Sequence, residues 1–476
     1  MNKLFIISSL ALLLSGCASY YQRNIEFQTE FANGEMDKAE KTLEGNKKMK
    51  KDRNRFLYLT NMGVVKHLQQ DFESSNQFFN EADLLFEDYR KNYASEALAL
   101  ISNPEVKPYK PEDFEPVMVH YYKALNYLNL YKYDEAIVEA KRMNLMLNQL
   151  NDKYKDNKNR YQADAFAHII IGLAYEASGE LNDAFIAYRN AYEVYTGEHG
   201  YFDIEVPVQL KEDLLRTSYV LGFRSEFEWY QRAFGVDDYS YEPLEFGEAI
   251  IFWQNGLCPI KDEWSINFIA VPGQGGVVNF TNEELGMTFP FYIGDDKQKK
   301  NDLLALKVVR VAFPKYLERP TLYKNGWIEL SGKKFELDKV EDVNAIAFKT
   351  LQDRFVREMG SALLRLALKK ISEIQLQQQN EALGALATIT NAVTEKADTR
   401  NWQTLPHTIY YARVPLNEGG NEVLLKMKTK DNQVHRTSFN FQGKKGSMYF
   451  MPYQSLESGP AATWDNAGNT KPVMKD

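Results

Sequence analysis

The feature that most constrains this chain is a recurring pattern of small and aromatic residues between residues 20 and 235. Apolar residues there follow the i, i+3, i+4 spacing of amphipathic helices. Two segments carry matching residue types at offsets 0, 12, 16 and 19: Gly63, Ser75, Phe79 and Ala82 in the first, and Gly172, Ala184, Tyr188 and Ala191 in the second. A third segment holds a related set: Ala124, Tyr127, Ala136, Ala140 and Met143. Small residues let antiparallel helices approach closely and aromatic residues fill the space beside them, so the pattern predicts stacked helix pairs.

The pattern resembles the tetratricopeptide repeat, and "FANGEMDKAEKTL", with Ala39 in the small-residue position, looks like half of another unit. The spacing departs from the usual length of about 34 residues, because a Pro-rich loop at 102–116 and a charged loop at 151–160 intervene. We expect an α-solenoid, with an unrelated helical bundle as the alternative. A hairpin formed by Val206–Leu221 and Glu226–Phe234 is expected to cap it, with Gly222 in the turn.

The aligned repeats place one apolar set of residues on the concave face of the solenoid. This candidate groove consists of Leu57, Thr60, Val64, Met118, Tyr121, Leu125, Leu128, Phe166, Ile169 and Leu173. It lacks the Lys and Arg expected of a clamp for a carboxylate tail. Large exposed apolar patches mark interaction sites, so something should cover this one. We expect the cover to come from the chain's own second half, with an apolar helix or peptide of a partner as the alternative.

After Gly235 the pattern changes to alternating runs bounded by Gly, Pro and Asn, which is typical of strands. The expected strands lie at 248–256, 264–271, 287–293, 304–313, 326–332, 333–337, 408–416, 421–429 and 434–441. A helical region at about 343–395 separates the two groups. The predicted fold class is therefore α+β multidomain: a tetratricopeptide-like α-solenoid at 17–235, a β-rich domain at 236–451 with a helical insertion at 343–395, and a flexible tail at 452–476.

The first 17 residues combine one cation, Lys3, with an apolar run from Leu4 to Leu14 that is too short to span a bilayer. Leu14-Ser15-Gly16-Cys17 resembles the lipobox of bacterial lipoproteins. This resemblance implies a signal peptide at 1–16 and a lipid anchor on Cys17; the alternative is an ordinary secretory signal with an incidental cysteine. Ala18 follows the cysteine where retention in the inner membrane would favour Asp, and no acidic cluster follows. We therefore expect an outer-membrane protein facing the periplasm.

A second motif, "ADTRNWQTLP" at 397–406, supplies six candidate residues: Asp398, Thr399, Arg400, Trp402, Leu405 and Pro406. It resembles a signature in an uncharacterised family of bacterial outer-membrane lipoproteins that combine N-terminal tetratricopeptide-like helices with such a C-terminal domain. The stretches 247–261 and 362–370 resemble the same family, for which no activity is established. Physically, an Asp-Thr-Arg turn can close a charge-assisted hydrogen-bond network with Trp402 packed beneath it. The alternative is a patch that binds a partner.

The chemistry that the sequence lacks narrows the function. The formal net charge of −8 argues against nucleic acid as a partner. The six histidines form no HExxH pair and there is no G-x-S-x-G elbow. We expect no catalytic residue, metal or cofactor. His67, His120 and His168 are expected to be groove or packing residues, and Cys258 a small buried one.

These observations favour a non-enzymatic scaffold for protein–protein interaction in the bacterial envelope. Its expected partners are the membrane, through the lipid on Cys17, and an unidentified envelope protein. A glycan- or nutrient-binding lipoprotein of the starch-binding Sus type is the alternative. A third interpretation, an envelope hydrolase, has no recognisable nucleophile to support it.

Overall fold

The computed structural model describes residues 19–92, 107–151, 161, 163–198, 200–379, 396–458, 462–464 and 470–472. The expected signal peptide at 1–16, the expected lipidation residue Cys17 and the part of the expected insertion at 380–395 lie outside these residues.

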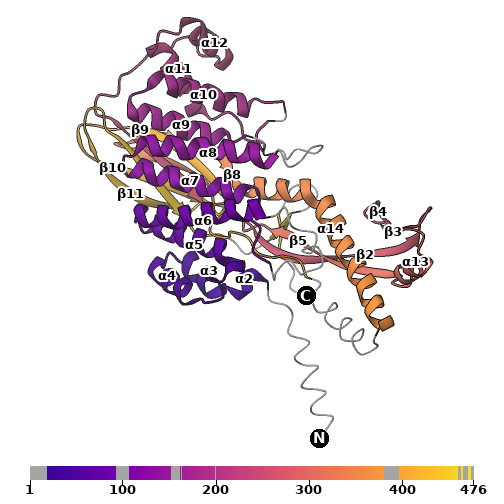
Figure 1. Cartoon of the computed structure of the whole chain (residues 1–476). Helices are drawn as coiled ribbons and strands as arrows, with labels where there is room; N and C mark the ends of the chain where they lie inside the picture. Colours follow the sequence, from indigo (N-terminus) through magenta and orange to yellow (C-terminus); the bar gives the residue numbers. More distant parts are fainter. Residues whose placement is uncertain are drawn as a thin grey trace.

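The first half of the chain folds into successive helices that stack into one curved array (Figure 1). It begins with α2 (Tyr20–Arg23), α3 (Ile25–Ala32), α4 (Met36–Gly45) and the 3-10 turn η1 (Asp52–Asn54). The array continues with α5 (Arg55–Leu68), α6 (Phe72–Asn92), α7 (Phe114–Asn129), α8 (Tyr133–Asn151), α9 (Ala165–Ser178) and α10 (Leu181–Tyr195). It ends with the capping pair α11 (Val208–Val220) and α12 (Arg224–Phe234). Gly222 takes a φ of 71° in the turn between the last two helices, a conformation that glycine adopts without strain.

The small residues of the repeats stand where paired helices touch. A Cβ atom on Gly63 of α5 would lie 2.6 Å from the ring of Phe79 on α6, and one on Gly172 of α9 would lie 2.3 Å from the ring of Tyr188 on α10. Ser75 also donates a 2.7 Å hydrogen bond to the Gly63 carbonyl. These contacts confirm the tetratricopeptide-like packing that the sequence pattern predicts.

The second half forms three four-stranded sheets. The first has the order β12-β1-β9-β8 and consists of β1 (Glu248–Asn255), β8 (Asp338–Asp342), β9 (Thr408–Pro415) and β12 (Met448–Ser455). The second has the order β11-β10-β6-β7, from β6 (Tyr323–Leu330), β7 (Lys333–Glu336), β10 (Gly419–Thr429) and β11 (Val434–Gly443). The third has the order β4-β3-β2-β5, from β2 (Ile260–Pro272), β3 (Val277–Asn282), β4 (Met287–Tyr292) and β5 (Val308–Leu317). A further sheet of two antiparallel strands consists of β13 (Ala462–Trp464) and β14 (Thr470–Pro472).

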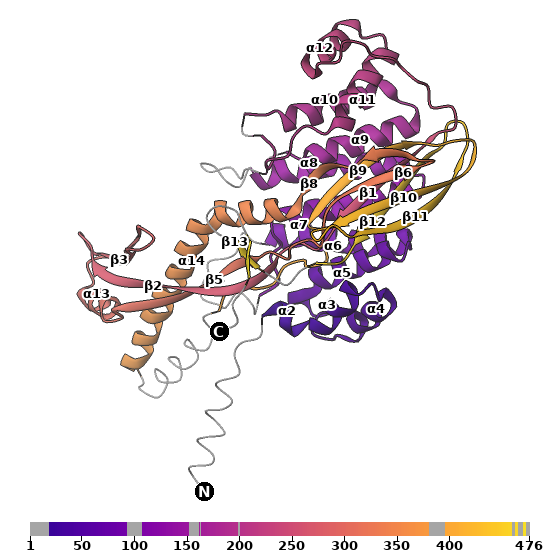
Figure 2. The same ribbon diagram turned by 180° about the vertical axis from the view of Figure 1, so that it is seen from behind.

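The first sheet is the middle of three layers, and its alternating side chains belong to two different cores. Ile250 and Phe252 of β1 pack with the helices, whereas Ile251 and Trp253 pack with the second sheet. All eight residues of β1 are buried, as expected for a strand covered on both faces. Figure 2 shows the two sheets lying over one face of the helical array.

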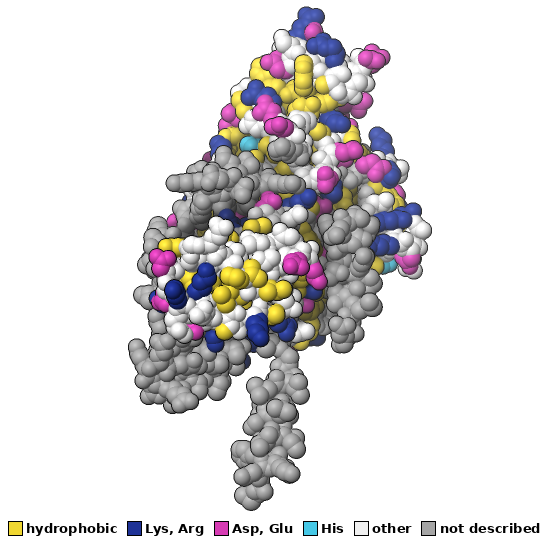
Figure 3. Space-filling view, turned by 90° about the vertical axis from the view of Figure 1, so that its right-hand side faces the viewer, with side chains coloured by type: hydrophobic (Ala, Val, Ile, Leu, Met, Phe, Trp, Pro, Cys, Tyr) yellow, Lys and Arg dark blue, Asp and Glu magenta, His cyan; other side chains and the backbone are white. Residues whose placement is uncertain are grey.

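The third sheet forms a separate projection, which we call the arm, together with α13 (Lys297–Leu304) and α14 (Val343–Gln379). The arm extends sideways from the array in Figure 1. One face of its sheet packs on α14 through residues such as Phe268, Val311 and Leu363. Figure 3 views the molecule from the side of the arm and shows hydrophobic side chains gathered on its surface, with Lys and Arg around them.

The structure confirms the predicted fold class and corrects three details. Strand β12 runs to Ser455, so residues 452–455 belong to a sheet and not to the expected tail. Pro452 is tolerated because β12 is at the edge of its sheet. No strand was expected between those at 264–271 and 287–293, but Val277–Asn282 forms β3. The expected strand at 304–313 begins only at Val308, because α13 ends at Leu304.

Candidate functional site

The main candidate site is the motif segment, residues 396–407. This segment forms neither helix nor strand, and its residues from Thr399 to Pro406 are buried. It contacts the helices on one side and the β-rich region on the other. Thr399 accepts a 3.0 Å hydrogen bond from the Tyr20 amide of α2, and the Leu405 carbonyl accepts one of 2.8 Å from the Cys258 amide. The motif therefore joins the two halves of the molecule.

Arg400 makes the densest set of contacts in the segment. Its Nε and Nη2 atoms donate to the two carboxylate oxygens of Asp398 at 2.8 and 2.6 Å. Its Nη1 donates to the carbonyls of Arg53, at 2.7 Å, and Lys107, at 3.2 Å. Burial acts to raise the pKa of Asp398, but the hydrogen bonds and charge of Arg400 outweigh it and hold this pKa below its usual value. Asp398 and Arg400 therefore form a bidentate ion pair, and Arg400 also attaches the turn to the helical array.

Trp402 lies fully buried between the two halves. Its ring packs against Phe79 of α6 and Tyr122 of α7, with both centroid distances 5.9 Å. Its indole donates a 2.8 Å hydrogen bond to Thr404, whose hydroxyl donates to Asn61 of α5 at 2.9 Å. An indole N–H needs such a partner once it is removed from water. The packing and the hydrogen bonds together fix the segment against α5, α6 and α7.

Glu115 at the start of α7 receives the backbone of the motif. Its carboxylate accepts hydrogen bonds from the Trp402 amide at 2.7 Å and from the Tyr109 hydroxyl at 2.7 Å. Complete burial raises the pKa of Glu115 to about 7, although these hydrogen bonds act in the opposite direction. The Asp398–Arg400 turn and Glu115 thus hold successive parts of the segment.

A second polar link lies farther along the array, around Arg413 of β9. Its guanidinium donates to Glu176 of α9 at 2.5 Å, to Asp213 of α11 at 2.7 Å and to both oxygens of Glu248 on β1. Arg216 of α11 bridges the first two carboxylates. Burial acts to raise the pKa of Glu176, but the charges of Arg413 and Arg216 lower it to about 2. These residues come from distant parts of the sequence and share no motif, so sequence reasoning missed them.

A third link is formed by Glu112, which precedes α7. Its carboxylate pairs with Lys261 of β2 and with Arg354 of α14. All three side chains are buried. The base of the arm is thereby tied to the helical array.

The ten residues of the candidate groove are all buried, with exposed fractions of 0 to 3 %. Strand β1 covers part of them: Gln254 donates a 2.8 Å hydrogen bond to the Tyr121 hydroxyl, and the rings of Phe252 and Phe166 lie 5.9 Å apart. Within the part of the chain that the structure describes, these ten residues therefore line no open groove. The sequence allowed two ways to cover these residues, the chain's own second half or a partner's helix or peptide. In the structure the chain's own β-rich region covers them.

Of the three histidines, His67 is buried as expected, whereas His120 bonds to Glu139 at 2.7 Å in a buried charged cluster and His168 is partly exposed. His67 bonds to Asn126 at 2.6 Å, and burial lowers its pKa to about 4. Burial also raises the pKa of Cys258 to about 11, which leaves its thiol protonated. Among the described residues, no group of three His, Cys, Asp or Glu side chains could hold a metal ion. Across the same residues, no helix has both the length and the apolarity needed to cross a bilayer.

No family model and no curated protein matches the chain. Solved structures similar to it include MamA from Desulfovibrio magneticus RS-1, at 16 % identity and a TM-score of 0.28, covering 46 % of this chain and 93 % of that one. The tetratricopeptide-like repeats of a Podosopora anserina putative kinesin light chain give 12 % identity and a TM-score of 0.31, covering 46 % and 94 %. Apo RapI gives 15 % and 0.33, covering 50 % and 60 %. The tetratricopeptide-like description of the helical array rests on its own packing at Gly63 and Gly172.

Proposed function

We propose that this protein is a non-enzymatic scaffold, anchored to the outer membrane by a lipid on Cys17, that holds another envelope protein. The observation that carries the proposal is the filling of the helical groove by the chain's own first sheet and motif segment. A groove closed in this way leaves the array as a rigid support rather than a peptide receptor. The resemblance of Leu14–Cys17 to the lipobox of bacterial lipoproteins supports the anchor, and the resemblance of the motif to a family of outer-membrane lipoproteins supports the location.

The anchor would place one end of the molecule at the membrane. Only Ala18 separates Cys17 from Ser19, the first described residue and the N-cap of α2. Two residues span about 7 Å at most. The α2 end of the array would therefore lie at the lipid headgroups, with α12 at the opposite end.

We assign the contact with the partner to the arm. One face of its sheet packs on α14 and the other is exposed. On the exposed face, Ile269 and Val308 lie opposite each other with exposed fractions of 46 and 58 %, and Tyr292 has an exposed fraction of 73 %. Apolar groups gathered on a surface mark interaction sites. An envelope protein with an apolar surface of its own is the partner that this face fits.

The anchor is tested by metabolic labelling with an alkyne fatty acid. The full chain should incorporate the label and sediment with outer membranes, and Cys17→Ser should lose both properties. A Cys258→Ser variant is the matched control and should remain labelled. Label retained in Cys17→Ser would contradict the anchor.

The scaffold role is tested by photo-crosslinking in cells, with a photoreactive amino acid at position 292 or 308. Both positions should give the same crosslinked envelope protein. The control position is Lys445, in the exposed turn between β11 and β12, which should give none. Failure of both arm positions to crosslink to any protein would contradict the assignment to the arm.

A further inference from the structure

A basic cavity lies beside α2, at the end of the molecule that the proposed anchor would bring to the membrane. Its volume is about 260 Å³. The lining residues come from α2, from the loop between α4 and α5, and from the motif: Tyr20, Arg23, Asn24, Asn46, Lys48, Met49, Arg53, Asn54 and Arg400. A single water needs about 10–15 Å³ of such volume, so the cavity has room for a much larger group.

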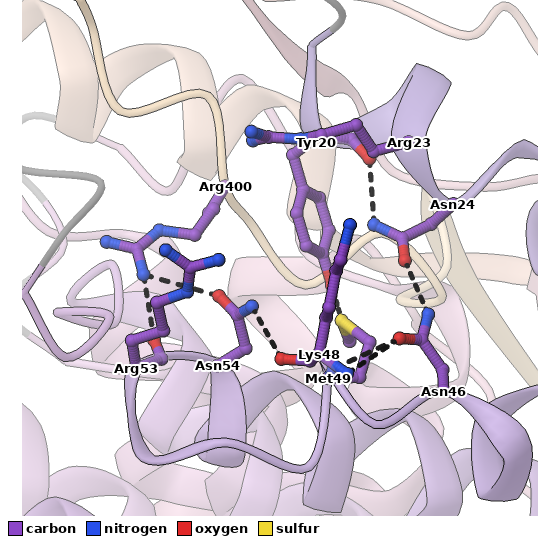
Figure 4. Close-up of a pocket in the computed structure, with 9 residues that line it drawn as sticks. All are labelled: Tyr20, Arg23, Asn24, Asn46, Lys48, Met49, Arg53, Asn54 and Arg400. Carbon is purple, nitrogen blue, oxygen red and sulfur yellow. Dashed lines mark hydrogen bonds between the residues drawn. The ribbon is translucent and has the colours of Figure 1, made fainter.

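All the charged side chains that line the cavity are positive. The lining contains four cations, Arg23, Lys48, Arg53 and Arg400, and no carboxylate. Arg400 is compensated by Asp398, which lies outside the lining. Figure 4 shows the guanidinium groups of Arg23 and Arg53 on one side of the Tyr20 ring and the Lys48 amine on the other. A phosphate group in the cavity would lie beside these side chains, and it could accept charge-assisted hydrogen bonds from them.

The walls of the cavity are held in place by polar contacts. Asn24 donates to the Tyr20 carbonyl at 2.8 Å, and Asn54 donates to the Lys48 carbonyl at 3.1 Å. Asn46 accepts from the amides of Lys48 and Met49. The Tyr20 hydroxyl donates to the Met49 sulfur at 3.4 Å. The loop that carries Lys48 and Arg53 is therefore organised before any ligand arrives, which lowers the entropic cost of binding.

We propose that this cavity binds a phosphate group, and that its source is the headgroup of an anionic lipid. Arg and Lys side chains give phosphate oxygens charge-assisted hydrogen bonds, and Arg can do so with two parallel bonds. The position of the cavity beside Ser19 favours a lipid over a soluble anion. This assignment of the source rests on the proposed anchor at Cys17, whereas the phosphate chemistry does not.

The test is calorimetric titration of the full chain, purified in a neutral detergent, with three probes. These are dihexanoyl phosphatidylglycerol, inorganic phosphate and zwitterionic dihexanoyl phosphatidylcholine. We expect saturable binding of phosphatidylglycerol and weaker or no binding of phosphatidylcholine. The variant Lys48→Gln with Arg53→Gln should weaken binding at least about tenfold, since each charge-assisted hydrogen bond lost is about a tenfold effect.

The matched control variant is Arg232→Gln with Lys445→Gln, which removes the same charges from exposed positions on α12 and in the β11–β12 turn. It should bind like the unaltered chain. Binding of inorganic phosphate alone, with the same dependence on Lys48 and Arg53, would support the phosphate site and overturn the lipid as its source. No saturable binding of either anion, or equal losses in both variants, would overturn the site. Because the titration does not require the anchor, failure of the fatty-acid labelling at Cys17 would be a separate result.

Discussion

At the scale of single residues, two arginines far from the chain ends hold the helices to the sheets. Arg400 is forked with Asp398 and donates to carbonyls that flank α5 and α7. Arg413 is surrounded by Glu176, Asp213 and Glu248. A buried charge that loses its partner is costly because the remaining charge has neither water nor a counter-ion. Each arginine is therefore expected to stabilise the fold by pairing with the buried carboxylates and carbonyls around it.

Replacing Arg400 with Ala should lower the free energy of unfolding by about 3–5 kcal/mol, the usual cost of breaking a buried ion pair. The free energy of unfolding of Arg400→Lys should lie between those of the unaltered chain and Arg400→Ala, because lysine keeps the charge but cannot form the bidentate pair with Asp398. The measurement is denaturant unfolding of the full chain. Arg436→Ala, at an exposed position on β11, is the control and should change the value by no more than about 0.5 kcal/mol. An Arg400→Ala effect as small as the control's would show that the motif does not join the two halves.

Glu115 should make stability depend on pH. Its pKa is raised to about 7 in the folded protein and is about 4.3 in an unfolded chain. Between these values the folded state binds the proton more tightly, so the contribution is fully present below pH 4.3 and is lost as pH rises through 7. The free energy of unfolding of the unaltered chain minus that of Glu115→Gln should fall by about 2–3 kcal/mol from pH 4.5 to 7.5. A difference independent of pH would contradict the raised pKa.

At the scale of the elements, two helix pairs of the repeats have a glycine on one helix in close contact with an aromatic ring on the other. Replacing Gly63 or Gly172 with Ala puts a methyl group against Phe79 or Tyr188. Each change should lower the free energy of unfolding by about 1–3 kcal/mol, the cost of overpacking. Gly45→Ala is the control, because Gly45 is helical and has nothing within 4 Å of the added Cβ. Thermal unfolding measures all three, and an equal effect at Gly45 and Gly63 would contradict the close helix contact.

Much of the element order could be predicted because it is encoded locally. A continuous apolar run marks β1, alternation marks β10 and β11, and small-residue spacing marks the helix pairs, since these patterns arise from neighbours in the sequence. Strand β12 was missed because Pro452 interrupts its pattern and only its pairing with β1, some 200 residues earlier in the sequence, makes it a strand. The cluster around Arg413 was missed for the same reason. What a side chain meets across the fold cannot be inferred from its own neighbours in the chain.

At the scale of the whole molecule, the helices and the β-rich region form one three-layered body with a projecting arm. The composition of the candidate groove indicated that it needed a cover, and the structure shows which part of the chain supplies it. The motif, whose residues suggested either a structural turn or a partner patch, is buried at the contact between helices and sheets. Binding of another protein would then use the outer surfaces, and the helical array would serve as support.

Native-state hydrogen exchange of the full chain, read by mass spectrometry, tests most directly whether the motif fills the groove. The Trp402 amide donates to buried Glu115, and the surrounding backbone from Thr399 to Leu405 is buried although it has no regular secondary structure. Peptides covering 399–405 should therefore exchange as slowly as peptides from α7. The exposed turn at 430–433 should exchange within seconds and serves as the internal reference. Fast exchange of 399–405 while α7 stays protected would contradict the account.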